Sequence, residues 1–213
     1  MAQETTIDHY LGSSRLIITK SKSKDSPGDT GSNQPKKAYC SLIPVELRLW
    51  LAYDWEAVYR QRKLTLLPAK FTVSQIMDNY LTFKELREPV NQLKFKALVK
   101  QTNNLKAHFN MTLSKLLYKF ERSQYSVMVK EFPDTAMSEV YGGIHLLRLF
   151  VKLSRVRPFS CTAPNKKALK LPVVLAYVQD FSNYLCDNWS TFFSMQDYED
   201  ASLEYLMEQL RIE

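Results

Sequence analysis

Apolar residues recur every three or four positions through most of the chain after Ser41, a spacing that places them along one face of an α-helix. Pro44 precedes the clearest stripe, and proline suits a first helical turn because the N–H that it lacks has no partner there. That stripe has one residue every four positions: Leu47, Leu51, Trp55 and Tyr59. No segment alternates convincingly between apolar and polar residues, and no internal period recurs. We therefore expect an all-α, multi-helix domain, with a minor β-hairpin as the one exception.

The same spacing predicts further helices after the first. A capping box supports the start of one of them, because the Thr72 hydroxyl and the Gln75 amide can each bind a backbone N–H. Gly142 and Gly143 weaken the first turns of another, by about 1 kcal/mol per glycine relative to alanine. The last segment, 199–211, is amphipathic and acidic. The expected helices are 44–60, 73–87, 92–113, 122–131, 138–155 and 172–187, with one more turn at 189–193.

Residues 1–40 have the composition of a tail. The stretch from Lys20 to Lys37 contains no large apolar side chain. Such a stretch buries too little surface to offset the entropy that is lost on ordering. We therefore expect a disordered polar and basic tail over 1–40 and one folded domain over 41–213.

The charge of the chain is unevenly distributed. There are 29 Lys+Arg and 22 Asp+Glu residues, a formal net charge of +7. Residues 1–40 hold six basic and four acidic groups, whereas residues 197–213 hold one basic and six acidic groups. The net charges are thus +2 for 1–40, +10 for 41–196 and −5 for 197–213. The +10 segment supports weak, salt-dependent contact with nucleic acid, and an ordinary solvated surface is the alternative explanation.

The cysteines and the apolar runs indicate in which cellular compartment the chain is expected. Cys40, Cys161 and Cys186 are odd in number and widely spaced, which fits neither a disulfide framework nor a CxxC metal site. A reducing compartment, cytosol or nucleus, is therefore expected. The longest apolar run, Leu171 to Val178, is far shorter than the roughly 20 residues of a membrane span. We expect no membrane contact.

Catalytic motifs are missing from the sequence. Its five glycines fit neither a phosphate-binding loop nor a dinucleotide fingerprint, and neither GxSxG nor HExxH occurs. His9, His108 and His145 are far apart and lack a nearby cysteine or a pair of carboxylates. His145 is expected to be a hydrogen-bonded structural residue, and Cys161 a free thiol. We therefore expect no enzyme, no metal and no cofactor.

The first helix has more aromatic surface than one packing face can use. Trp50, Tyr53, Trp55 and Tyr59 point to several sides of it. Either the helix is central and fully buried, or one side forms a binding groove.

Several blocks of the sequence resemble the MRG domain of the mortality-factor-related chromatin proteins. They occur in order over about 41–200, and the two longest are specific to that family. The blocks are Ile43-Pro44-Val45-Glu46-Leu47, Trp50-Leu51, Asp54-Trp55, Arg60-Gln61, Leu67-Pro68-Ala69-Lys70, Leu116-Leu117-Tyr118-Lys119-Phe120-Glu121-Arg122, Gln124-Tyr125, Pro133-Asp134, Met137-Ser138, Val140-Tyr141-Gly142, His145-Leu146-Leu147-Arg148-Leu149-Phe150-Val151, Asp180-Phe181, Tyr184-Leu185 and Asp197-Tyr198-Glu199.

The resemblance implies a nuclear, non-catalytic docking domain. In that family a hydrophobic groove takes helical and extended segments of partner subunits of histone acetyltransferase and histone deacetylase complexes. The resemblance would make Trp55 and Tyr118 large anchors of the groove and Lys152 a charge at its rim. The groove residues that it implies are Ile43, Leu51, Ala52, Trp55, Tyr118, Val151 and Lys152.

Three departures from the family pattern bear on partner choice. Ala52 and Lys152 stand where the family has valine and arginine, which changes the groove volume and removes a bidentate donor. Longer members carry an N-terminal chromodomain with an aromatic cage for methylated lysine. Tyr10 and Tyr39 are the only aromatic residues before Ser41, whereas a cage needs two or more aromatic rings on a folded sheet. We therefore expect a form without the chromodomain that does not read methyl-lysine.

Overall fold

A computed structural model describes residues 43–87, 91–154 and 170–212, and it confirms the all-α class. The expected tail and Cys161 lie outside these residues. In chain order the elements are α2 (Val45–Trp55), the π-helix η2 (Glu56–Arg60), β1 (Lys63–Thr65), α3 (Val73–Arg87), α4 (Gln92–Thr112), the 3₁₀-helices η3 (Leu113–Lys115) and η4 (Lys119–Glu121), α5 (Arg122–Glu131), the 3₁₀-helix η5 (Met137–Glu139), α6 (Gly143–Ser154), α7 (Lys170–Asp187), α8 (Trp189–Phe192), the 3₁₀-helix η6 (Met195–Asp197), β2 (Tyr198–Asp200) and α9 (Leu203–Ile212).

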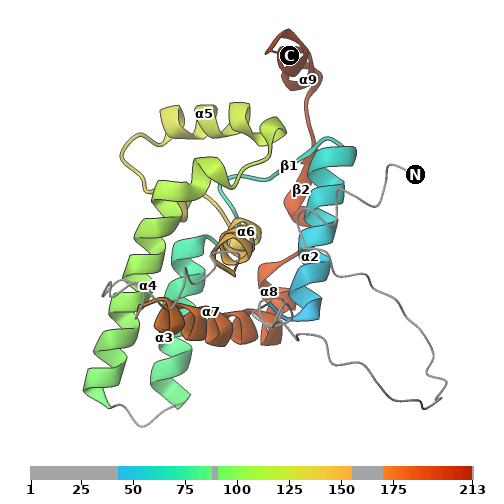
Figure 1. Ribbon diagram of the computed structural model, residues 1–213. Helices are drawn as coiled ribbons and strands as arrows, with labels where there is room; N and C mark the ends of the chain where they lie inside the picture. The colour runs from blue at the N-terminus through green and yellow to red at the C-terminus, as the bar shows by residue number, and fades with distance from the viewer. Residues whose placement is uncertain (1–42, 88–90, 155–169, 213) are drawn as a thin grey trace, which may run out of the picture.

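The helix α6 lies at the centre of the fold. Figure 1 shows it end-on, with α2 on one side, α3 and α4 on the other and α7 below it. All residues from Gly143 to Val151 are buried. A helix that is buried on every side is expected to be enclosed by other helices, and α2, α3 and α7 each pack against α6. None of the described helices is long and apolar enough to cross a membrane.

Local signals set the start of α3. The Gln75 N–H donates to the Thr72 hydroxyl at 3.3 Å, and the Thr72 N–H donates to the Gln75 side-chain oxygen at 3.0 Å. This is the predicted capping box, and α3 runs from Val73 to Arg87 as expected. The helix α5 likewise has its predicted bounds, Arg122–Glu131.

The predicted start of the helix at Ser138 is wrong, because α6 begins at Gly143. Residues before it bond elsewhere: the Ser138 N–H donates to the Asn110 side chain at 2.8 Å, and Tyr141 O accepts the Val73 N–H at 2.8 Å. Gly142 forms an isolated antiparallel bridge with Thr72. Residues 137–139 form the separate 3₁₀-helix η5, and these bonds keep residues 138–142 out of α6.

The small sheet is not a hairpin. Its two strands, β1 and β2, pair antiparallel with Lys63 opposite Asp200 and Thr65 opposite Tyr198. They come from opposite ends of the described chain, so the expectation of a local hairpin is wrong. The pairing instead fixes the segment after α8 against the end of the first helix.

Gly142 lets two backbone segments approach closely. A Cβ atom at Gly142 would lie 2.9 Å from the Ala69 Cβ and 3.2 Å from the Phe71 carbonyl oxygen. Real Cβ contacts are not that short, so only glycine fits there. The approach positions the Ala69–Phe71 segment beside the start of α6.

Candidate docking groove

The helix α2 is apolar on two sides, of which only one is buried. Leu47 and Leu51 belong to the main core, whereas Val45, Leu49 and Tyr53 are exposed. The helix is therefore not fully buried, and a binding groove on one side of it stays a prediction. The helix packs against α6 and α7 and still presents apolar side chains to solvent.

The seven expected groove residues lie just before α2 and on it, before η4 and at the end of α6. Ile43, Leu51 and Val151 are buried in one core cluster, with exposed fractions of 6%, 2% and 8%. Ala52, Trp55 and Tyr118 are partly buried, and Lys152 is exposed in the last turn of α6. The packing of α2 on α6 brings these two elements together. Four of the seven are thus at least partly accessible to solvent, whereas Ile43, Leu51 and Val151 are core residues.

Tyr118 is tied directly to α2. Its hydroxyl donates to the Asp54 carboxylate at 3.3 Å, and its backbone N–H donates to Glu121 at 2.7 Å. The Trp55 ring, at the end of α2, stacks on Tyr59 with centroids 5.2 Å apart and 17° between the planes. Both large rings are therefore held by neighbours, as the anchors of a docking surface should be.

A buried ionic network supports this region. The Arg148 guanidinium donates to Asp54 at 2.8 and 2.7 Å, and to Glu121 at 2.6 and 3.0 Å. The Tyr198 hydroxyl also donates to Asp54, at 2.9 Å. The side chains of Arg148, Asp54 and Glu121 are almost wholly inaccessible to solvent. Buried charges of this kind are tolerated only when they are paired and hydrogen-bonded, and here they are.

The network shifts the pKa values of its members. Burial by itself would raise the pKa of Glu121, but the Arg148 charge and the His145 hydrogen bond lower it to about 2. Burial opposes the charged form of Arg148, and Asp54 and Glu121 nevertheless raise its pKa well above the ordinary value. Burial and the nearby Asp54 raise the pKa of Tyr198. One cation therefore faces two carboxylates, and the donors around them stabilise the excess negative charge.

His145 is a buried, hydrogen-bonded residue, as its sequence context predicts. Its Nε2 lies 3.3 Å from a Glu121 oxygen. Burial and the Arg148 charge lower the pKa of His145, so the ring is neutral near pH 7. Since the Glu121 carboxylate only accepts hydrogen bonds, Nε2 carries the proton and donates. The histidine is thus a member of the ionic network.

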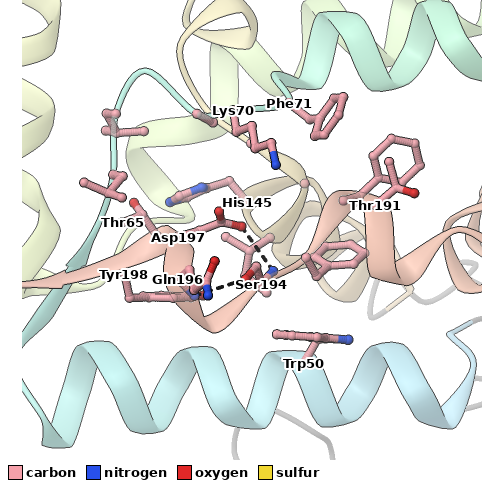
Figure 2. A pocket seen from close by; sticks show the side chains of 18 of the residues that line it. Trp50, Thr65, Lys70, Phe71, His145, Thr191, Ser194, Gln196, Asp197 and Tyr198 are labelled. Carbon is pink, nitrogen blue, oxygen red and sulfur yellow. Dashed lines mark hydrogen bonds between the residues drawn. The ribbon is translucent and has the colours of Figure 1, made fainter.

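A separate cavity of about 570 Å³ lies beside Trp50, and none of the seven groove residues lines it. In Figure 2 the Trp50 ring closes one side, Lys70 and Phe71 lie opposite, and Asp197 lies between them. Burial raises the pKa of Asp197, whereas the Ser194 N–H and the Lys70 charge act against that rise. Aromatic rings and polar side chains line this cavity together.

Sequence reasoning missed the ionic network. Asp54, Glu121 and Arg148 are far apart in the chain, and no spacing rule links them. One signal was available, because Arg148 interrupts the apolar run from Ile144 to Val151. A charge inside such a run predicts a buried partner.

Within the described ranges, no cluster of three or more His, Cys, Asp or Glu side chains could hold a metal ion.

The fold is that of a helical domain in which one side of α2 leaves apolar side chains exposed. The MRG family profile matches residues 19–200, and the chain belongs to the MRG family. Mortality factor 4-like protein 1 of Homo sapiens is 42% identical over 164 residues, which cover 76% of this chain and 44% of that protein. The NuA4 complex subunit EAF3 homolog of Drosophila melanogaster is 42% identical over 165 residues, 77% of this chain and 38% of that protein. Mortality factor 4-like protein 2 of Homo sapiens is 41% identical over 164 residues, 76% of this chain and 55% of that protein. The chain spans about half the length of the curated relatives that it matches.

Proposed function

We propose that the chain is a non-catalytic nuclear adaptor of chromatin-modifying complexes. A groove takes helical or extended segments of partner subunits. Its residues are Ile43, Leu51, Ala52, Trp55, Tyr118, Val151 and Lys152. The observation that carries the proposal is the placement of Trp55 and Tyr118: each is a large ring, partly buried, and held by a neighbouring side chain.

The energetics of docking favour this arrangement. Large aromatic side chains that are held rigid lose little conformational entropy when a partner binds, and such residues commonly contribute 2 kcal/mol or more on truncation. Leu51 and Val151 belong to the main core cluster, whereas Tyr118 packs against the smaller cluster of Val58, Leu64 and Phe120. Lys152 is exposed at one end, where it suits an acidic residue of the partner.

The family suggests the kind of partner. One relative is named as a NuA4 complex subunit homolog, and the resemblance associates the family with histone acetyltransferase and deacetylase complexes. By this inference the chain contributes to transcription regulation through the complexes that it joins.

Affinity purification of the tagged chain, with quantitative mass spectrometry, tests the proposal. Trp55→Ala should reduce recovery of chromatin-complex subunits at least about tenfold, since 2 kcal/mol is more than a factor of ten in affinity. Tyr53→Ala is the matched control, because Tyr53 is an exposed aromatic residue on α2 outside the groove. Helical circular dichroism should be unchanged in both variants. Equal recovery with Trp55→Ala and the original chain would overturn the groove.

Direct nucleic-acid binding is the alternative function. Lys94, Lys96 and Lys100 are exposed on α4, within the segment of net charge +10. Such contacts would be micromolar or weaker, and their affinity would fall steeply with salt. A gel-shift assay at low ionic strength tests this alternative. The absence of a shifted band at high micromolar protein concentration would exclude direct nucleic-acid binding.

A further inference from the structure

The C-terminal helix α9 lies beyond the family match. The profile ends at residue 200, and α9 covers Leu203–Ile212. Figure 1 shows α9 at the periphery of the fold, following β2. The contacts that α9 makes are therefore not part of what the MRG profile describes.

One side of α9 is firmly attached to the body. The Tyr205 hydroxyl donates to the Phe120 carbonyl oxygen and accepts the Gln124 N–H at 3.2 Å. The Tyr205 ring packs edge-on against the Phe120 ring, with centroids 5.3 Å apart. The Gln209 amide donates to the Ser123 hydroxyl at 2.6 Å. The orientation of α9, and hence of its other side, is thereby fixed.

The other side of α9 is an exposed apolar stripe. Leu203, Met207 and Leu210 have exposed fractions of 72%, 52% and 74%, and their spacing of four and three residues places them on one face. A small cavity of about 160 Å³, lined in part by Leu206 and Leu210, borders this stripe. An apolar face held in a fixed orientation is a candidate contact surface.

The charges beside the stripe are arranged with opposite signs at its two ends. Glu204 lies in the first turn of α9 and Arg211 in the last, both exposed. Their seven-residue separation puts them on the same flank of the stripe. When two such helices pack antiparallel about a two-fold axis, Glu204 of each faces Arg211 of the other, and Leu203 faces Leu210. The face is therefore complementary to a second copy of itself.

We infer that α9 is a self-association surface, through which two copies of this chain pair their helices antiparallel about an axis near Met207. The surface is separate from the proposed groove and contains none of its residues. A helix of 10 residues is only about 15 Å long, so the pair buries less area than a standard interface. The dimer is accordingly weak, with a dissociation constant on the order of 100 µM.

Sedimentation equilibrium of the full chain, at concentrations from about 10 µM to about 1 mM, tests this surface. The average mass should rise from 24.8 kDa toward twice that value. Met207→Glu should keep the chain monomeric over the whole range, because it sets two carboxylates opposite each other across the axis. Since Met207 is exposed, this variant should fold normally.

A charge exchange tests the antiparallel arrangement itself. Glu204→Arg alone and Arg211→Glu alone should each weaken association at least about threefold, whereas the double variant should return to within about twofold of the original chain. Leu86→Glu is the control for Met207→Glu, because Leu86 is also exposed (82%, against 52% for Met207) but lies on α3. Trp55→Ala should leave association unchanged, which separates this surface from the groove. A chain that stays monomeric near 1 mM, association that persists in Met207→Glu, or a double variant no better than the singles would overturn the inference.

Discussion

The guanidinium carbon of Arg148 lies 4.2 Å from the centroid of the Tyr118 ring, so a fully buried cation supports one of the two proposed groove anchors. The same guanidinium binds Asp54 of α2 and Glu121 of η4. Tyr118 is thus joined to the interior by this cation and by the hydrogen bond of its hydroxyl to Asp54. The stability of the fold and the shape of the proposed groove would therefore depend on the same group.

Removal of the buried cation should strongly destabilise the fold. Arg148→Met leaves two buried carboxylates without their partner, and breaking such a pair costs about 3–5 kcal/mol. Lys84→Met is the matched control, because the Lys84–Asp180 pair at 2.8 Å is partly exposed and should contribute less than about 1 kcal/mol. Urea unfolding monitored by circular dichroism measures both. Similar losses in the two variants would contradict the structural role of the network.

Acidification should weaken the fold in two steps. The pKa of His145 is lowered from 6.5 in the folded chain, so unfolding takes up a proton and becomes easier as the pH falls below about 6.5. The pKa of Glu121 is about 2 against an ordinary 4.5, so its contribution is complete above about pH 4.5 and is lost as the pH falls toward 2. The raised pKa of Asp197 acts in the opposite sense.

The contribution of His145 to this pH dependence can be isolated by substitution. Each proton taken up on unfolding changes the unfolding free energy by up to about 1.4 kcal/mol per pH unit. His145→Gln keeps a donor toward Glu121 but does not titrate, so stability measured between pH 7 and 5 should become nearly flat. An unchanged slope in this variant would show that His145 is not the group responsible.

Gly142→Ala should destabilise the chain by about 1–3 kcal/mol, because its Cβ atom would overlap the Ala69 Cβ. The double variant with Ala69→Gly removes that overlap and should recover part of the loss, although the Phe71 carbonyl oxygen remains close. Thermal unfolding of the single and double variants measures the recovery. Additive losses in the double variant would mean that the two segments do not meet as described.

Elements with local signals were predictable from the sequence. The α3 start follows from Thr72 and Gln75, which are three residues apart and bond to each other. The bounds of α5 and the position of α2 follow from apolar spacing alone. The contacts that determine where these elements begin and end join residues that are within one or two helical turns of each other in the sequence.

Features that depend on long-range contacts were not predictable. The pairing of Thr65 with Tyr198 and the bond from Val73 to Tyr141 join segments with no common pattern. The same holds for the Arg148 network, whose three charged members come from α2, η4 and α6. The groove residues came from family resemblance, because apolar spacing on α2 shows an excess of aromatic surface without showing which side is used.

Photo-cross-linking from two adjacent positions of α2 tests the proposed groove most directly. Ala52 belongs to the proposed groove, whereas Tyr53 points about 100° away around the helix and is exposed. A photoreactive amino acid at position 52 should cross-link to co-purifying chromatin-complex subunits at least about fivefold more than one at position 53. Stronger cross-linking from position 53, or none from position 52 while the partners still co-purify, would contradict the groove.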